Sequence, residues 1–391
     1  MALKYLYVPS GYRGGGSSGT AYGVLPNTAA ADLAFVRGTS ATRINADGLI
    51  QSEITNVPRL DYTDGTCPTL LTEPASTNLL HNSGWEGGGA LPTDWSYGNS
   101  GGTSTPVIST RGTIIKAYRF QTSSARHSFN RNTTSVSGTT YTLSVYVESI
   151  TGSSQFNSIL YRVGGGGTDI FKKDGVVVSS TEGVVAGSFY SITFTSNAVQ
   201  TIEFRVGLGV IGDVTGDVTI SQPQLETLAY RTSFMISAIG AIATRSADTG
   251  VISGDLSSYI NSSEGVLEIK AKALFNGGND CRITLSNGTN NNRVGLIWFS
   301  SPNNTSVIVQ KDATTVVNPN LNIDQTLMTT FKIKWKSGDI QVKVNGTVVF
   351  TDTSTFSELI LDQLSFSKGT ETNFFQGNVQ YIKVYDSVTD F

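Results

Sequence analysis

The stretch that decides the fold is Phe331-Lys-Ile-Lys-Trp-Lys-Ser-Gly-Asp-Ile-Gln-Val-Lys-Val-Asn-Gly346. Apolar and polar side chains alternate on both sides of Ser337-Gly338-Asp339, and a period of two is the pattern of a half-buried β-strand. The polar triplet predicts a turn between two antiparallel strands, and Asn345-Gly346 predicts a second turn into a third strand. One face of this small sheet is apolar, with Trp335 in it, so we expect that face to lie in a core.

The same alternation recurs through most of the chain. In 141–148 the residues Tyr141, Leu143, Val145 and Val147 share one face, and 189–194 and 201–206 follow the same pattern. No amphipathic run is long enough to indicate a substantial helix. Many short strands separated by Gly, Asn, Ser and Thr turns are typical of antiparallel sandwiches or barrels. We therefore expect an all-β protein built from two antiparallel jelly-roll β-sandwiches.

The composition changes along the chain suggest four segments. Residues 1–78 are rich in small residues and have few clear strands, which predicts an arm or small module that orders against something else. Residues 79–229 and 253–391 are strand-rich, and each has a length suited to one sandwich. The segment 230–252 between them is apolar but has small side chains, and we interpret it as a connector.

The charge of the chain excludes several classes of partner. With 27 Lys and Arg against 30 Asp and Glu over 391 residues, the formal net charge is −3. This charge gives no electrostatic reason to expect binding to nucleic acid or to an acidic membrane. Two cysteines, Cys67 and Cys281, are too few for a disulfide framework or a multi-cysteine zinc site. We expect no signal peptide and no transmembrane helix, because neither apolar pattern occurs.

Catalytic residues of the common hydrolases are scarce. The two histidines lie 46 residues apart without a metal-binding spacing. The enzymatic alternative is glycoside hydrolysis, which needs two carboxyl groups about 5 to 9 Å apart. Glu264 and Glu268 lie four residues apart on one strand face, but the pattern lacks the aspartate that sandwich-fold glucanases place between their glutamates. A solvated strand face is the commoner role for such a pair.

One weak metal signal lies in Gly212-Asp-Val-Thr-Gly-Asp217. The carboxylates of Asp213 and Asp217 could supply oxygen ligands to calcium from a loop. A polar turn explains the same residues without a metal, and we favour that interpretation. No other cofactor is indicated.

Aromatic residues in loops are the candidates for ligand binding. Trp85, Trp95 and Tyr97 lie among Gly, Asn and Ser residues, where rings can stack on sugars while polar neighbours bind the hydroxyl groups. The alternative, which we favour, is that the two tryptophans close the open end of the sandwich. Trp298 is ambiguous because the strand around it is apolar on both faces.

Three passages resemble known proteins. The run 37–50, followed by 56–62, Cys67-Pro68 and 70–80, resembles a segment that recurs in structural proteins of tailed bacteriophages. The residues 223–226, 230–234 and 243–248 are similar to the close of a phage jelly-roll domain of the carbohydrate-binding-module type. The region 265–390, with Lys343-Val-Asn-Gly346 and 375–386, resembles a concanavalin A-like (laminin G-like) sandwich. The last two specify a fold more than a ligand.

The resemblance implies a virion component that is made in the host cytoplasm and exposed after lysis. It also implies a homotrimer, since phage fibres and adhesins are commonly trimers. We expect a non-enzymatic tail or head fibre or adhesin, anchored by residues 1–78 to other virion proteins and presenting its sandwiches to host-surface glycans. The alternatives are a structural capsid or tail decoration protein that binds no sugar, and a glycosidase that cleaves polysaccharide.

Overall fold

The computed structural model describes residues 2–9, 19–152, 154–389 and 391. The chain forms two compact units. Unit 1 comprises Met1–Asp47, Ser52–Pro74 and Ser246–Phe391, and unit 2 comprises Gly48–Gln51 and Ala75–Arg245. The strand ladders of both units are antiparallel, which confirms the expected all-β sandwich class. No helix in the described part of the chain is long and apolar enough to cross a membrane.

The first sheet of unit 1 has the order β29-β28-β27-β22-β31-β7-β6, and β1 also pairs with β31. Its strands are β1 (Leu3–Tyr7), β6 (Arg59–Asp61), β7 (Thr69–Thr72), β22 (Glu264–Ala273), β27 (Thr329–Lys336), β28 (Ile340–Val344), β29 (Thr347–Asp352) and β31 (Gly377–Tyr385). The predicted hairpin is β27 and β28, with Phe331 opposite Val344 and Ile333 opposite Val342. Asn345 and Gly346 have positive φ, as the second turn requires.

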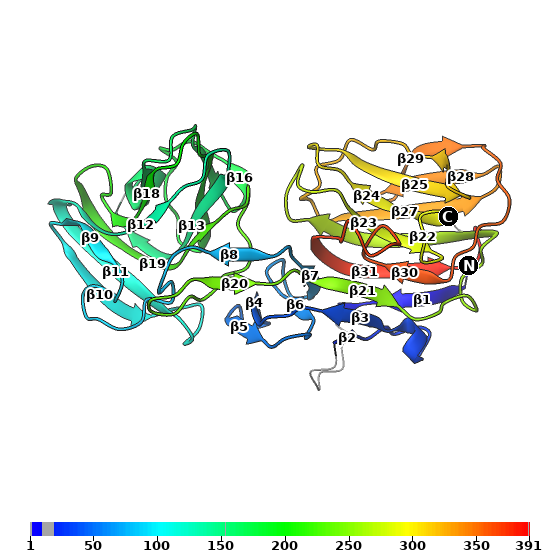
Figure 1. Cartoon of the computed structure of the whole chain (residues 1–391), viewed down its shortest axis with the longest axis horizontal. Helices are drawn as coiled ribbons and strands as arrows, with labels where there is room; N and C mark the ends of the chain where they lie inside the picture. Colours follow the sequence, from blue (N-terminus) through cyan, green and yellow to red (C-terminus); the bar gives the residue numbers. More distant parts are fainter. Residues whose placement is uncertain (1, 10–18, 153, 390) are drawn as a thin grey trace. The chain divides into compact units, whose positions relative to one another are not determined.

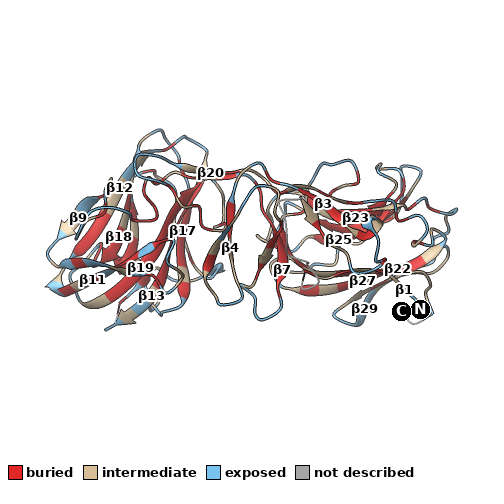
Figure 2. Ribbon diagram, turned by 90° about the horizontal axis from the view of Figure 1, so that it is seen from below, coloured by how far each residue is buried: buried red, intermediate tan, exposed pale blue. Residues whose placement is uncertain are grey.

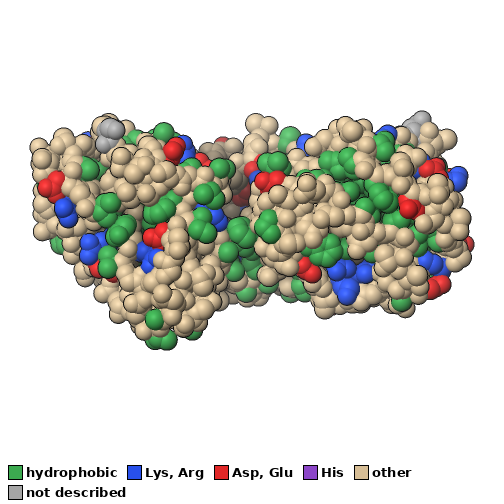
Figure 3. All heavy atoms as spheres, turned by 90° about the horizontal axis from the view of Figure 1, so that it is seen from above, with side chains coloured by type: hydrophobic (Ala, Val, Ile, Leu, Met, Phe, Trp, Pro, Cys, Tyr) green, Lys and Arg blue, Asp and Glu red, His purple; other side chains and the backbone are tan. Residues whose placement is uncertain are grey.

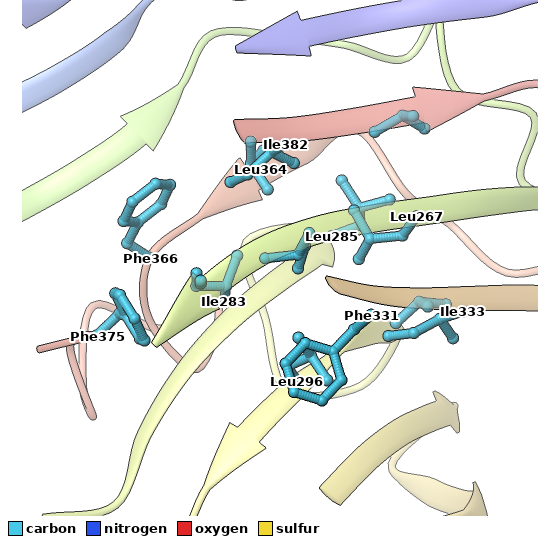
Figure 4. Close-up of a cluster of buried hydrophobic side chains, with 14 of the residues drawn as sticks. Leu267, Ile283, Leu285, Leu296, Phe331, Ile333, Leu364, Phe366, Phe375 and Ile382 are labelled. Atoms are coloured by element: carbon cyan, nitrogen blue, oxygen red, sulfur yellow. The ribbon is translucent and has the colours of Figure 1, made fainter. Parts of the chain in front are cut away.

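The second sheet of unit 1 has the order β2-β3-β21-β30-β23-β24-β25-β26. Its strands are β2 (Thr20–Ala21), β3 (Leu33–Val36), β21 (Thr249–Ser253), β23 (Cys281–Ser286), β24 (Arg293–Trp298), β25 (Thr305–Lys311), β26 (Thr314–Val317) and β30 (Gln363–Ser365). The two sheets enclose one apolar core. Figure 4 shows part of it, where Leu267, Ile333 and Ile382 of the first sheet face Ile283 and Leu296 of the second.

The N-terminal segment contributes strands to unit 1, which differs from the expected separate arm at 1–78. β1 continues the first sheet beside β31, and β3 pairs with β21 in the second sheet (Figure 1). Tyr5, Leu33 and Phe35 are buried in the common core. Residues 1 and 10–18 of the segment lie outside the described residues. The sequence did not indicate this pairing because the partner strands are more than 200 residues away.

Unit 2 consists of a seven-stranded sheet, β10-β11-β19-β13-β17-β15-β16, and a four-stranded sheet, β14-β18-β12-β9; β8 and β20 pair separately. The strands are β8 (Ser76–Asn78), β9 (Ser96–Ser100), β10 (Thr103–Ile108), β11 (Lys116–Ala125), β12 (His127–Thr134), β13 (Thr140–Thr151), β14 (Leu160–Val163), β15 (Ile170–Lys173), β16 (Val176–Val177), β17 (Ser188–Thr195), β18 (Thr201–Leu208), β19 (Val214–Glu226) and β20 (Ala243–Arg245). The remaining elements of the chain are η2 (Ala29–Ala31), β4 (Ala41–Ile44), β5 (Ile50–Glu53) and α1 (Phe156–Ile159). Figure 2 shows the buried residues along the strands of both units.

The segment expected as a connector, 230–252, is folded into the two units. Phe234 and Met235 are buried in unit 2, where the Asn78 side chain donates a hydrogen bond to the Met235 carbonyl (2.9 Å). β20 pairs with β8, so residues up to Arg245 belong to unit 2. From Ser246 the chain belongs to unit 1 and forms β21. Both ends of the segment are therefore held by packing and strand pairing, whereas residues 238–242 are exposed.

A network of buried ion pairs connects the two parts of unit 1 that are separate in the sequence. Arg37 and Arg59 both bind the Asp248 carboxylate, and Arg59 also binds Glu73 at 2.5 Å. All four residues are almost completely buried. Despite burial, these two carboxylates hold the pKa of Arg59 above its ordinary value, so the guanidinium stays charged. The network joins the N-terminal segment to the first residues after unit 2.

The two cysteines provide a simple test of this fold. Cys67 is exposed, whereas Cys281 lies in the unit 1 core, where burial raises the pKa of its thiol to about 12. Because the thiolate is the reactive form, native protein should take up iodoacetamide on Cys67 alone, and Cys281 should react only in denaturant. Peptide mass spectrometry measures both sites. Equal labelling of both cysteines in native protein would contradict the predicted core.

Asp248→Asn tests the buried ion network. The substitution keeps the size of the side chain but removes the buried carboxylate that Arg37 and Arg59 share, so we expect a loss of about 3 to 5 kcal/mol in the free energy of unfolding. Asp64→Asn is the control, because Asp64 forms a partly exposed pair with Lys272 (2.6 Å) and should cost about 1 kcal/mol or less. Urea unfolding of the full chain measures both. Similar losses in the two variants would refute the structural role of the network.

Candidate functional site

Trp85 and Trp95 lie inside unit 2 and not on its surface. Trp85 is fully buried and Trp95 is 4% exposed. The Trp85 ring packs edge-on against Trp95 (5.7 Å between centroids) and Tyr118 (5.4 Å). The Trp95 indole N–H donates to the Asn82 carbonyl at 3.1 Å. Neither ring has a free face for a sugar, so their assignment as ligand-binding residues is corrected to a core role.

The other two aromatic candidates differ from each other. Trp298 is buried in unit 1 and contacts Phe375 (4.7 Å between centroids), so it too has no free face for a ligand. Tyr97 is 41% exposed and packs beside His127 (5.3 Å) at the edge of the four-stranded sheet. Of the four residues, the structure therefore leaves Tyr97 alone accessible to a ligand.

The two aspartates of the calcium signal point to separate arginines. Asp213 pairs with Arg126 at 2.8 Å, and Asp217 pairs with Arg119. Residues four apart on an extended chain are separated by about 13 Å, too far to share one ion. Within the described residues, no group of three or more His, Cys, Asp or Glu side chains is placed to hold a metal.

The glutamates of the hydrolase alternative are both ion-paired. Glu264 binds Lys336 at 2.7 Å, whereas Glu268 is 5% exposed and accepts a hydrogen bond from the Tyr381 hydroxyl at 2.9 Å. Burial, and then the Glu268 carboxylate, raise the pKa of Tyr381 to about 12. Four residues along β22 separate the two Cα atoms by about 13 Å, and each carboxylate pairs with a different lysine, unlike the closely spaced carboxyl pair of a glycosidase.

The outer side of the four-stranded sheet carries a different set of polar residues. Tyr161 on β14 lies opposite Arg205 on β18, and Arg205 lies opposite Asn130 on β12. Glu203 is the next residue of β18 on the same side, because Ile202, Phe204 and Val206 point into the core. We call Tyr161, Arg205, Asn130 and Glu203 the unit 2 polar face.

Arg205 and Glu203 are held rigidly at the centre of this face. Arg205 donates to both oxygens of Glu203, from Nε at 2.8 Å and Nη2 at 3.1 Å, and the Asn130 amide donates to the same carboxylate at 2.8 Å. The hydrogen bond from Arg205 lowers the pKa of Glu203, with Asn130 contributing. A bidentate pair fixes both side chains in one plane, so the face is preorganised.

The unit 2 polar face keeps groups available for a ligand. In the described part of the chain, neither Arg205 Nη1 nor the Tyr161 hydroxyl has a hydrogen-bond partner. All four residues are partly exposed. A ring with a free hydroxyl, beside a fixed donor and a fixed acceptor, can bind a polyhydroxylated ligand. The sequence predicted strand 201–206 but not this face, because the register with β12 and β14 cannot be read from one strand.

Comparisons with known proteins give little further information. No protein-family model matches the chain, and no curated protein matches it significantly. Among solved structures, it is similar to a protein from Bacteroides ovatus ATCC 8483 described as a "putative carbohydrate binding protein". The identity is 11%, the match covers 67% of this chain and 76% of that chain, and the TM-score is 0.19. A similarity this weak carries no argument about the function of this chain.

Trp85→Ala distinguishes a core residue from a ligand platform. Removing a buried tryptophan should cost about 3 to 5 kcal/mol in the free energy of unfolding. Tyr97→Ala is the control, since an exposed ring at the sheet edge should cost about 1 kcal/mol or less. Denaturant titration followed by circular dichroism measures both. A stable Trp85→Ala protein would contradict the core assignment and return Trp85 to the list of ligand-binding candidates.

Proposed function

We propose that this chain is a non-enzymatic surface protein of a tailed-bacteriophage virion that binds host-surface glycans through the unit 2 polar face. The observation that carries the binding part is the preorganised Arg205–Glu203 pair beside Tyr161. The virion part rests on the sequence passages that resemble phage structural proteins. In this proposal the protein is made in the host cytoplasm, assembles as a homotrimer and attaches to other virion proteins.

A neutral glycan suits the chemistry of this surface. In the view of Figure 3, uncharged polar side chains and backbone cover most of the surface, with Lys, Arg, Asp and Glu scattered among them. Such a surface gains little from long-range attraction, so recognition depends on short hydrogen bonds and ring stacking. Each site would be weak. Several copies on one particle would still hold a cell surface through their combined binding.

Binding without hydrolysis agrees with the state of the carboxylates. A glycosidase needs one carboxylic acid that keeps its proton near neutral pH. Glu203 has a lowered pKa because Arg205 and Asn130 stabilise its charged form. Glu264 and Glu268 are each paired with a different lysine. These features support the non-enzymatic assignment.

A decoration protein without sugar binding is the second candidate. The observation that favours it is the burial of Trp85, Trp95 and Trp298, which removes three of the four expected stacking residues. In this candidate too, residues 1–78 would attach the protein to the particle, yet the strands of this segment are part of unit 1. Deleting residues 1–78 would therefore damage the fold as well as any attachment. Point variants of the full chain separate the two functions better.

The test is binding of the labelled full chain to a panel of intact bacterial strains, before and after periodate oxidation of their glycans. We expect binding that periodate abolishes, and that falls about tenfold or more in Arg205→Ala and in Tyr161→Ala, because each removes a short polar contact. Arg119→Ala is the matched control: like Arg205→Ala it breaks an arginine–carboxylate pair, here with Asp217 on the seven-stranded sheet, and should bind normally.

Two results would contradict the proposal. Binding that survives in both Arg205→Ala and Tyr161→Ala would place the ligand elsewhere on the chain. Absence of binding to every strain, even when the protein is displayed in many copies on a bead, would favour the decoration protein. Thermal melts of each variant show whether a loss of binding reflects a loss of folding.

A further inference from the structure

Three cationic side chains gather on the outer side of the second sheet of unit 1. Arg282 on β23 and Arg293 on β24 face away from the core, because Ile283, Leu285 and Val294 point into it. Ser286 lies opposite Arg293, which places the two arginines on the same side of the sheet. The backbone carbonyl of Lys368 lies 3.5 Å from Arg293 Nη1. We call Arg282, Arg293 and Lys368 the unit 1 cationic cluster.

Among the described residues this cluster has no carboxylate partner, unlike most other cations of unit 1; Lys343, which lies over the Phe391 ring, is another exception. On the first sheet, Lys334 binds Asp339 at 2.7 Å and Lys336 binds Glu264. Within the described residues, Arg282, Arg293 and Lys368 form no ion pair. Arg293 is only 6% exposed, yet its Nε donates to a neutral acceptor, the Gln310 side chain, at 2.7 Å. Arg282 Nε is buried and has no hydrogen-bond partner.

The three positive charges destabilise one another. Burial, and then Arg282, lower the pKa of Arg293 to about 10. Burial lowers the pKa of Lys368, and Arg282 and Arg293 add to this shift. The acidic residue that acts on Arg282 is Asp280, whose carboxylate accepts the Ser300 backbone N–H at 2.8 Å. Glu371, near Lys368 in the chain, is exposed and forms no ion pair in the described residues.

The surroundings of the cluster are ordered. The Thr284 hydroxyl donates to the Ser367 carbonyl at 2.9 Å, and the backbone N–H of Arg282 donates to the Asn373 carbonyl at 3.1 Å. These bonds hold the loop between β30 and β31 over the outer side of β23. Arg282 Nε lies buried beside this loop without a partner, and as an N–H donor it is a group that a bound anion satisfies. Unsatisfied buried polar atoms are rare in proteins and call for a specific explanation.

We propose that the unit 1 cationic cluster is a binding site for an oxyanion, namely the carboxylate of an acidic sugar or a phosphate group. Burying positive charge without a counter-charge is unfavourable, and a bound anion removes that cost. Guanidinium groups match carboxylate and phosphate oxygens with paired hydrogen bonds. The site lies in unit 1 and uses none of the residues of the unit 2 polar face, so it goes beyond the function proposed above.

The test is calorimetric titration of the full chain with three probes. These are a hyaluronan oligosaccharide, which carries uronic acids, inorganic phosphate, and a neutral chitin oligosaccharide of the same length. We expect an anionic probe to bind, with the affinity falling as salt is raised. Binding by the hyaluronan oligosaccharide supports an acidic sugar as the ligand, and binding by phosphate supports a phosphate-bearing one.

Variants assign the binding to the cluster. Arg282→Gln and Lys368→Gln should each weaken the anionic probe about tenfold or more, because each removes a charge-assisted contact. Lys368 is partly exposed, so the Lys368→Gln variant keeps the test valid if Arg282→Gln fails to fold. Lys336→Gln is the control on the opposite sheet and should bind normally. Arg205→Ala should also bind the anionic probe normally, which separates this site from the unit 2 polar face.

Two results would overturn the proposal. The first is that neither anionic probe binds at low salt, since an uncompensated cluster should bind anions best there. The second is that binding is the same in Arg282→Gln, Lys368→Gln and the parent protein.

Discussion

The position of the Asp248 carboxylate between Arg37 and Arg59 is the constraint on which the structure of unit 1 depends. Charges taken out of water must be paired closely, so these three residues and Glu73 have to meet in one place. They come from the two parts of unit 1 that precede and follow unit 2 in the sequence. Once they meet, β3 is held against β21, and the first strands become part of a sandwich whose remaining strands lie beyond residue 245. Unit 2 is thus inserted within the sequence of unit 1.

The need to pair buried charges also distinguishes cations that only stabilise the fold from cations that could bind a ligand. Where a buried or strand-borne cation has a carboxylate nearby, as Lys336 has Glu264, the pair is complete and needs no ligand. Arg282 and Arg293 have only neutral acceptors or none, which leaves positive charge uncompensated. The unit 2 polar face is an intermediate case. Its ion pair is complete, but it fixes Arg205 so that the remaining donor meets a ligand without rearrangement.

The two binding surfaces proposed for this chain differ in chemistry. The unit 2 polar face has a ring, a fixed donor and a fixed acceptor, and suits uncharged hydroxyl groups. The unit 1 cationic cluster suits negative charge. Bacterial surface polysaccharides combine both kinds of group, and a protein present in many copies on a particle would bind through many weak contacts. Because Trp85, Trp95 and Trp298 are buried, the candidate sites are polar residues on the outer faces of strands and not aromatic residues in loops.

The sequence by itself determined the fold class and several strands, because alternation is a local property. The hairpin of β27 and β28 follows from the period of two in 331–344 and from its turn residues. Glycine and asparagine around Trp85 indicated a loop. The Trp85 ring is nevertheless enclosed by rings from strands elsewhere in the sequence, among them Tyr118. Likewise, the alternation of β18 placed Glu203 and Arg205 on one side, and only the register with β12 brought Asn130 to them. Tertiary structure decided the partners because pairing between distant strands depends on the shared core and on buried charge, which no local pattern records.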